Sequence, residues 1–174
     1  MGKLVRNLVI MGSTGSVGTQ VLDVVRAFPD ELRVVALVAG TNFEVLQQQI
    51  VEFNPKWINS NCTSEEKLKL YSCGCMEKSI EEIVTLPEVD LVVTATSGDI
   101  ALVPTLIAIN HKKNIALANK ESIVLSGVEL VSKAKENSVN IFPLDSEPNA
   151  IWQCLRGEKK EISKLIITAS GGAL

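Results

Sequence analysis

The sequence predicts an α/β fold built on a doubly wound, mostly parallel sheet. Short apolar runs alternate with longer segments of helical period, a pattern that requires right-handed crossovers between parallel strands. Aromatic residues make up only 4% of the chain, so the core must consist mainly of Val, Ile, Leu and Ala, as in strands buried on both faces. A glycine-rich segment, residues 12–18, joins the first apolar run to the first helical segment.

The elements follow from the periodicity in chain order. Strands are expected at residues 8–11, 34–38, 56–58, 91–96, 115–118, 139–143 and 165–168. Helices are expected at residues 17–28, 43–53, 100–110, 122–137 and 150–155. The first helix has one apolar stripe, formed by Val17, Val21, Val24 and Val25. The polar residues 59–78 are expected to form a peripheral loop with a short helix.

Composition narrows the class of protein. A chain of 174 residues holds one domain, or one domain and the start of a second. The net charge of −3 argues against nucleic acid or an anionic membrane as the main partner. No apolar run approaches the ~20 residues needed to span a bilayer. The N-terminus lacks a secretory signal, which predicts a cytoplasmic or organelle-matrix protein.

The four cysteines do not predict a metal site. Cys73 and Cys75 are spaced more tightly than in a zinc knuckle, Cys62 and Cys154 lie apart from them, and the single histidine, His111, is distant in sequence. We therefore expect structural or incidental thiols and no zinc.

The glycine segment has the spacing G-x-x-G-x-x-G and lies between a predicted strand and a predicted helix. Gly12 and Gly15 permit a tight turn and the close approach of a pyrophosphate, while Gly18 lets the helix pack against the strand. The free N–H groups of the first helical turn and the helix dipole then favour the phosphates. The segment predicts a Rossmann-type dinucleotide site.

The end of the second strand favours NADP over NAD. Folds specific for NAD place an acidic residue about 20 residues after the glycine loop, but this chain has Gly40, Thr41 and Asn42 there. Thr41 and Asn42 could donate hydrogen bonds to a 2′-phosphate. An ordinary turn that caps the following helix explains the same residues equally well.

Three further motifs follow predicted strands: Leu-Ala-Asn-Lys-Glu-Ser at 117–122, Leu-Asp-Ser-Glu-Pro-Asn-Ala-Ile at 144–151, and Thr-Ala-Ser-Gly-Gly at 168–172. Together with the glycine loop, in this order and spacing, they make the chain resemble the 1-deoxy-D-xylulose-5-phosphate reductoisomerase family. The resemblance covers essentially all of the sequence, somewhat under half of a family member. It implies an NADP-binding domain at residues 1–144 and, at 145–174, the incomplete start of a catalytic, metal-binding α+β domain.

The resemblance also implies an activity. It is the rearrangement of 1-deoxy-D-xylulose 5-phosphate and its reduction by NADPH to 2-C-methyl-D-erythritol 4-phosphate, in the non-mevalonate isoprenoid pathway, with Mg, Mn or Co as the divalent metal. Homodimers are implied for the full-length enzyme. In the family a further glutamate metal ligand, most phosphate-binding residues and a C-terminal helical domain lie downstream of the position of Leu174. The chain is therefore expected to be a fragment that is inactive alone.

The resemblance assigns roles to individual residues. Those implied to bind NADPH are Thr14, Gly15, Ser16, Val17, Gly40, Thr41, Asn42, Asn119 and Glu121. Those implied to bind the substrate are Lys120, Ser146, Glu147 and Ser170, with Lys120 and Glu147 as catalytic residues. The metal ligands would be Asp145 and Glu147, which lie two residues apart at a strand end and offer hard oxygen ligands on one face. Lys120 would neutralise charge that develops on the substrate oxygens.

Departures from the family pattern and simpler interpretations stay open. Pro148 stands where the family usually has His, Thr41 where a basic residue is common, Val17 where Ile is more frequent, and Ala173 where Pro is usual. The acidic motif is also a good helix start, with Asp145 or Ser146 as the N-cap. Lys120 and Glu121 could be a solvated pair.

Two other classes of protein stay open as well. One is a different NADP-dependent oxidoreductase, such as a homoserine or semialdehyde dehydrogenase; the latter needs a catalytic cysteine near the sheet edge, whereas Cys154 is expected inside a helix. The other is a non-catalytic nucleotide-binding or interaction module.

Overall fold

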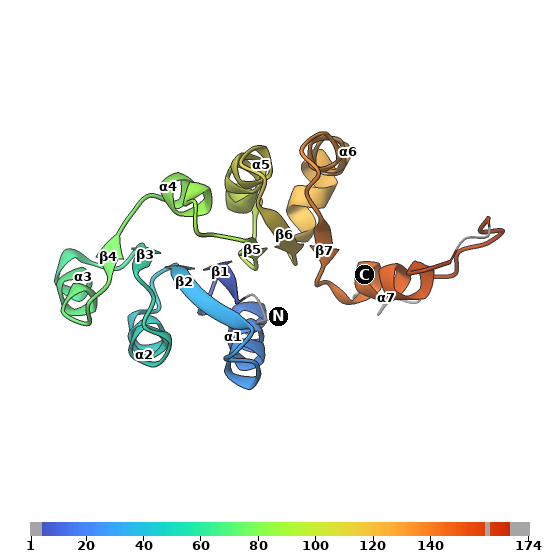
Figure 1. Cartoon of the computed structure of the whole chain (residues 1–174). Coiled ribbons are helices and arrows are strands. Elements are labelled where there is room, and N and C mark those ends of the chain that lie inside the picture. Colours follow the sequence, from blue (N-terminus) through green and yellow to red (C-terminus); the bar gives the residue numbers. More distant parts are fainter. Residues whose placement is uncertain (1–4, 159–160, 168–174) are drawn as a thin grey trace, which may run out of the picture.

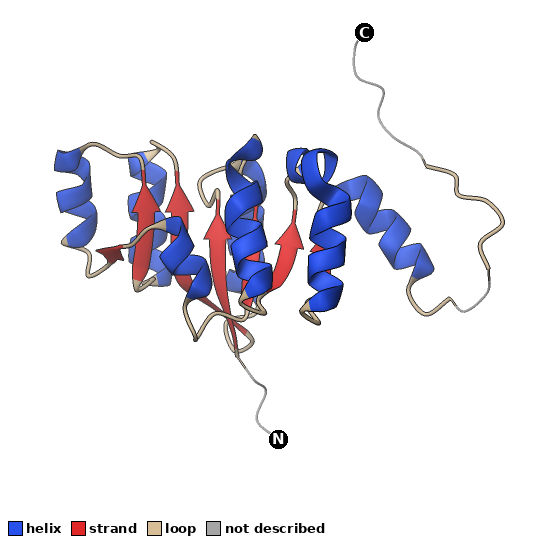
Figure 2. Ribbon diagram, turned by 90° about the horizontal axis from the view of Figure 1, so that it is seen from above, coloured by secondary structure: helices blue, strands red, loops and turns tan. Residues whose placement is uncertain are grey.

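The structure is a computed structural model that describes residues 5–158 and 161–167. Its sheet has the strand order β4-β3-β2-β1-β5-β6-β7, and every neighbouring pair is parallel. Figure 2 shows the long strand arrows pointing the same way. The strands are β1 (Arg6–Met11), β2 (Leu32–Ala39), β3 (Trp57–Ser60), β4 (Met76–Glu77), β5 (Leu91–Thr94), β6 (Asn114–Leu117) and β7 (Ile141–Pro143). The predicted doubly wound α/β fold is confirmed.

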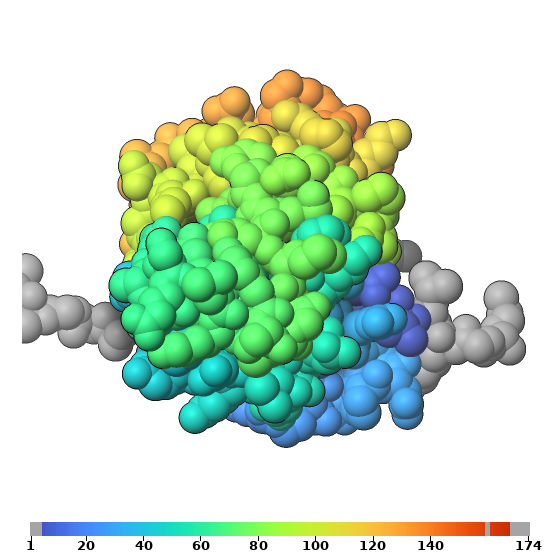
Figure 3. Space-filling view, turned by 90° about the vertical axis from the view of Figure 1, so that its left-hand side faces the viewer, coloured from blue at the N-terminus to red at the C-terminus, as the bar shows by residue number. Residues whose placement is uncertain are grey.

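Helices cover both faces of the sheet. They are α1 (Ser16–Ala27), α2 (Phe43–Phe53), α3 (Ser64–Tyr71), α4 (Ile80–Thr85), the 3-10 turn η1 (Asp99–Ala101), α5 (Leu102–Asn110), α6 (Lys120–Glu136) and α7 (Ser146–Leu155). In Figure 1, α1 and α2 lie on one face, α4, α5 and α6 lie on the other, and α7 extends beyond β7. At the opposite end of the sheet, α3 and α4 cover the side that faces the viewer in Figure 3.

The core consists of two apolar layers, one on each face of the sheet. In β1, Val9 and Met11 belong to one layer, while Leu8 and Ile10 belong to the other, and all four are at most 2% exposed. This alternation follows from the two-residue period of a strand. The central strands are therefore buried on both faces, as their Val, Ile and Leu content indicated.

The apolar stripe predicted for the first helix is correct only in part. The buried side of α1 is formed by Gly18, Leu22 and Val25, whereas Val17 is 37% and Val24 49% exposed. Positions 18, 22 and 25 share a face at helical period, and the small Gly18 brings that face against the strand. Of the four predicted valines, Val25 is buried and Val21 is half-buried, whereas Val17 and Val24 lie on the adjacent, solvated side.

Other boundaries differ from the predictions. The region 59–78 contains strand β4 as well as the expected helix, and α4 was not predicted; its capping box is formed by Ser79 and Glu82. The segment 100–110 divides into η1 and α5, and α6 begins at Lys120 with a non-helical residue, Ser126, inside it. Residues 165–167, expected in a strand, are exposed and irregular. Position 168 lies outside the described residues.

Over the described ranges, no helix combines the length and the apolar character that crossing a bilayer requires.

Candidate functional site at the carboxyl edge of the sheet

The glycine loop leads from β1 directly into α1. Gly12 donates its N–H to the Val38 carbonyl at 2.8 Å, Ser13 donates to the same oxygen at 3.1 Å, and Gly15 donates to the Gly12 carbonyl at 3.0 Å. Gly15 is the N-cap of α1 and provides no capping side chain. The first-turn N–H groups of a helix have no partner within the helix. This helix start can therefore receive an anion.

Two of the glycines are required by close backbone contacts. Gly12 has φ +83°, and a Cβ there would lie 2.6 Å from the Ala95 carbonyl oxygen. A Cβ on Gly18 would lie 2.2 Å from the Gly12 carbonyl oxygen. At Gly15 the nearest atom, 3.3 Å away, is again the Gly12 oxygen, so this position is less crowded. Gly12 and Gly18 thus set the path of the chain, and Gly15 leaves room beside the helix start.

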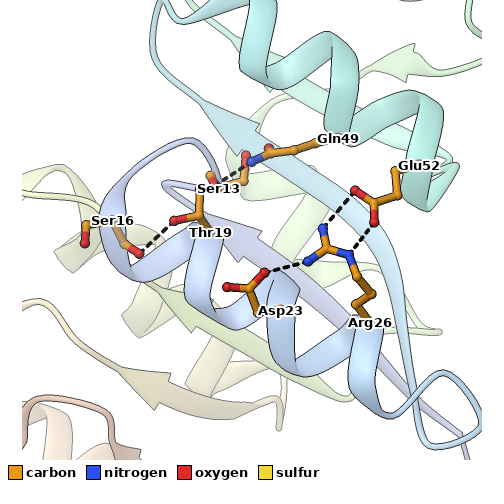
Figure 4. Close-up of polar contacts among 7 residues, drawn as sticks. All are labelled: Ser13, Ser16, Thr19, Asp23, Arg26, Gln49 and Glu52. Carbon is orange, nitrogen blue, oxygen red and sulfur yellow. Dashed lines mark hydrogen bonds and ion pairs between the residues drawn. The ribbon is translucent and has the colours of Figure 1, made fainter.

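Helix α2 fixes the loop from the side (Figure 4). The buried Gln49 donates through Nε2 to the Ser13 carbonyl at 2.9 Å. Arg26 of α1 reaches Glu52 of α2 with both Nε and Nη2, at 2.5 and 2.9 Å. This hydrogen-bonded guanidinium lowers the pKa of Glu52 below its usual value. The loop is consequently held on a rigid pair of helices.

A cleft of about 320 Å³ lies beside the glycine loop, at the carboxyl ends of the central strands. The chain runs outward from β1 to β4 on one side and resumes at β5 on the other, so β1 and β5 mark the topological switch point, where doubly wound folds bind ligands. The cleft is lined by Met11, Gly12, Thr14, Gly15, Val38, Ala39, Gly40, Asn59, Asn61, Ile80, Ala95, Thr96, Ser97, Ile100 and Ala101.

The structure brings three of the residues implied to bind NADPH into this cleft: Thr14, Gly15 and Gly40. Ser16 and Val17 follow as exposed residues of the first turn of α1. Thr41 is exposed, and Asn42 is the N-cap of α2, where its Oδ1 accepts from the Val45 N–H at 3.3 Å. The helix-capping interpretation of this turn therefore holds, and it leaves Thr41 free to face a ligand.

Asn119 and Glu121 brace the loop that follows β5. The buried Asn119 is the N-cap of α6, where its Oδ1 accepts from the Ser122 N–H at 2.7 Å. Its Nδ2 donates to the carbonyls of Thr96 and Gly98 at 2.7 and 2.8 Å. Glu121 accepts the Gly98 N–H at 3.0 Å, and this bond lowers the pKa of its carboxyl group. Both residues therefore hold in place the segment after β5 that lines one side of the cleft.

Lys120 and the acidic motif meet next to this brace. The Lys120 Nζ lies 3.2 Å from Asp145 Oδ1 and 3.9 Å from Glu147 Oε2. Asp145 is the N-cap of α7, but its side chain does not cap the helix. Ser146 donates to Glu147 Oε2 at 2.8 Å, and this bond is the main reason why the pKa of Glu147 is lowered. The hydrogen bond from Lys120 to Asp145 raises the pKa of the ammonium group.

The acidic pair fits part of a divalent-metal site. Carboxylate oxygens of Asp145 and Glu147 converge on one cationic nitrogen, so both can face one positive charge. Hard oxygen ligands of this kind suit magnesium or manganese. In the described parts of the chain, however, no cluster of three or more His, Cys, Asp or Glu side chains is placed to hold a metal. The described residues provide two ligands, and Ser170 lies outside them.

The glycine loop and the acidic pair lie at the same edge of the sheet. Both follow the carboxyl ends of strands that run parallel to one another. Thr96 lines the cleft and is bound by Asn119, whose neighbour Lys120 reaches Asp145. The two motifs are thus linked through one continuous set of contacts.

Several cleft residues were not predicted. Asn59 lies near the end of β3 and Asn61 follows it, Ala95, Thr96 and Ser97 follow β5, and Ile80 comes from α4. The residues at the ends of β3 and β5 could have been predicted from their position in the sequence. Parallel strands near β1 bring their following residues to the same edge of the sheet as the glycine loop. Gln49, which fixes the loop, carried no signal because its partner is a main-chain oxygen.

The fold and the glycine loop define a dinucleotide-binding α/β domain. Family models of 1-deoxy-D-xylulose 5-phosphate reductoisomerase match residues 8–127, and those of its C-terminal domain match residues 141–174. The chain belongs to the 1-deoxy-D-xylulose 5-phosphate reductoisomerase family. This membership decides against the other oxidoreductases considered above.

Relatives and solved structures support the same assignment. The reductoisomerase of Shouchella clausii is 45% identical over 97% of this chain and 46% of its own length. A crystal structure of DOX-P reductoisomerase with magnesium has a TM-score of 0.82 at 34% identity, covering 86% of this chain and 40% of that one. Another, with NADPH, fosmidomycin and magnesium, has a TM-score of 0.80 at 34% identity, covering 86% and 39%. The chain spans about half the length of the curated relatives that it matches.

Proposed function

We propose that this chain forms the NADPH-binding part of a reductoisomerase and binds the dinucleotide in the cleft beside the glycine loop. The cofactor pyrophosphate is bound by the first-turn N–H groups after Gly15, with Thr14 beside it. Gly40, Thr41 and Asn42 receive the adenosine end, and the loop braced by Asn119 and Glu121 borders the nicotinamide end. A solved structure of DOX-P reductoisomerase in complex with NADPH supports the choice of cofactor.

The substrate of the complete protein is, on this proposal, 1-deoxy-D-xylulose 5-phosphate, which is rearranged and reduced to 2-C-methyl-D-erythritol 4-phosphate. Bound in the cleft, NADPH would supply the hydride, and a divalent metal held by the acidic pair would polarise the substrate carbonyl. Asp145 and Glu147 hold the metal, Ser146 and Ser170 bind the substrate, and Lys120 places a positive charge next to its oxygens. The contacts of Lys120 with Asp145 and Glu147 are the observation that brings the lysine and the acidic pair together.

The observation that carries the proposal is the position of an uncapped helix start at the topological switch point of a parallel sheet. Titration with NADPH, followed by the cofactor's fluorescence, tests it. We expect saturable binding by the wild-type chain and a loss of at least tenfold in affinity for Gly15→Val, because the branched side chain occupies space needed by the pyrophosphate. Circular dichroism verifies that the variant is folded. Equal affinities would refute the placement of the cofactor.

We further propose that the 174-residue chain does not turn over by itself. With two carboxylate ligands among the described residues, a bound metal is held weakly. An assay with substrate, NADPH and Mn²⁺ should show no oxidation of the cofactor. Measurable turnover would contradict this part of the proposal and leave cofactor binding intact.

A further inference from the structure

We infer that Lys120 and the divalent metal compete for the same two carboxylates, so that metal binding releases the Lys120 ammonium group. The inference rests on the proposed function, because it takes Asp145 and Glu147 as the metal ligands. It adds a property of this chain's own side chains: the Lys120 ammonium group neutralises the two carboxylates until the metal replaces it.

The geometry places one cation at the point where the ligand oxygens converge. Lys120 Nζ is 3.2 Å from Asp145 Oδ1 and 3.9 Å from Glu147 Oε2. A metal bound by both carboxylates would have to occupy the region that the ammonium group now fills. A metal ion and an ammonium group that are both held by these two carboxylates would lie next to each other and repel. Simultaneous occupation by both cations is therefore unfavourable.

The exposure of the side chains determines which group moves. The side chain of Lys120 is 63% exposed, whereas those of Asp145 and Glu147 are 20% and 25% exposed. The backbone near the carboxylates is fixed by the Leu144 N–H, which donates to the Leu117 carbonyl at 2.8 Å. A long, solvated lysine can change its rotamer without disturbing the packing. The carboxylates stay in place and Lys120 leaves.

The exchange has a consequence for the reaction. After release, the ammonium group is still anchored at the first residue of α6, beside the loop braced by Asn119 and Glu121. It becomes available to substrate oxygens only when the metal is present. Lys120 would thus be poised for the substrate in the metal-bound protein and neutralised without the metal.

Binding of Mn²⁺ to the 174-residue chain, measured by the electron paramagnetic resonance signal of the free ion, tests the competition. Lys120→Met should raise the affinity about fivefold or more, the effect of removing a competing ion pair. The matched control is Lys133→Met, which removes the same charge from the same helix; Lys133 pairs with Glu136 at 3.1 Å. We expect the control to change the affinity less than twofold. An unchanged or lower affinity in Lys120→Met would overturn the inference.

Chemical labelling gives an independent readout. An amine-reactive reagent, with sites quantified by mass spectrometry, should label Lys120 at least threefold faster when Mn²⁺ is added, relative to Lys133 in the same sample. Protection of Lys120, or no change, would count against its release.

Asp145→Asn distinguishes an error in the proposed exchange from an error in the proposed metal ligands. If this substitution abolishes Mn²⁺ binding in the Lys120→Met background, while Lys120→Met alone binds no better than wild type, the metal site stands and the exchange is wrong. If Asp145→Asn leaves Mn²⁺ binding unchanged in both backgrounds, the metal ligands of the proposed function are wrong, and the exchange is overturned with them.

Discussion

Gly18 illustrates how a single hydrogen in place of a side chain sets the geometry of the cofactor loop. A Cβ there would lie 2.2 Å from the Gly12 oxygen and 2.7 Å from the Ser13 Cα, both main-chain atoms that cannot move independently. We expect Gly18→Ala to lower the free energy of unfolding by about 1–3 kcal/mol through overpacking. Gly15→Ala, whose nearest contact is 3.3 Å, should cost less than about 1 kcal/mol. Urea denaturation of both variants measures the difference, and equal losses would contradict the steric explanation.

Asparagine is the N-cap of both α2 and α6, but the two caps have different roles. Asn42 is exposed and accepts one bond of 3.3 Å, whereas Asn119 is 2% exposed and makes three bonds of 2.7–2.8 Å. Asn42→Ala should therefore cost about 0.5–1 kcal/mol, the usual value of a cap. Asn119→Ala should cost roughly 2–4 kcal/mol, because the buried Ser122 N–H and the carbonyl groups of Thr96 and Gly98 all lose their partner. Chemical denaturation of the pair provides the comparison, in which similar losses would argue against the brace.

The loop after β5 is held to helix α6 by a bond that depends on pH. Glu121 accepts the Gly98 N–H, and its pKa is lowered from the model-compound value of 4.5. Since the folded-state pKa is the lower one, this contribution is fully present above pH 4.5 and is lost as the pH falls through the folded-state value. The stabilities of wild type and Glu121→Gln should differ at pH 7 and converge as the pH falls through the folded-state pKa of Glu121. Amide exchange at Gly98 follows the same bond directly, and a difference that persists at low pH would exclude it.

At the scale of elements, the sequence predicted the central α/β units and missed the peripheral ones. Strands β1, β2 and β5 contain continuous apolar runs, which are recognisable in the sequence. Helix α2 has the predicted bounds. Strand β4 has only two residues, and α4 depends on a capping box, so neither has a long period to detect. The buried face of α1 was assigned only in part because Gly18, which defines it, is not hydrophobic. Contacts with the strand decide that face.

The same distinction applies to the site. The motifs at residues 117–122 and 144–151 lie at strand ends, as predicted, and therefore at one edge of the sheet, because parallel strands deliver their ends to one side. The contacts of Asn119 with Thr96 and Gly98 span more than 20 residues and depend on the pairing of β5 with β6. The Lys120–Asp145 pair likewise depends on the pairing of β6 with β7. Side-chain partners of this kind require the tertiary structure.

Taken as a whole, the molecule is acidic, yet the proposed cofactor is a polyanion. The net charge is −3, and no charged residue is among those that line the cleft. The attraction must then come from backbone N–H groups and the dipole of α1, acting against the overall field of the protein. Salt screens this repulsion, because charges separated by more than about 10 Å hardly interact at an ionic strength of about 0.1 M. Binding of NADPH to the wild-type chain should accordingly be insensitive to salt, or tighten slightly, between low and physiological ionic strength.

A positive charge introduced at the exposed end of the cleft should reverse the salt dependence of NADPH binding. Thr41 is exposed next to Gly40, where a guanidinium group could pair with the 2′-phosphate. We expect Thr41→Arg to tighten NADPH binding roughly fivefold to tenfold, to leave NADH binding nearly unchanged because NADH has no 2′-phosphate, and to make NADPH binding weaken with salt. Fluorescence titrations of both cofactors at two salt concentrations measure all three effects, with Thr85→Arg on α4 as the control for added charge. If NADH gains as much as NADPH, the adenosine end of the cofactor does not lie at Gly40–Asn42, and its orientation in the cleft must be reversed.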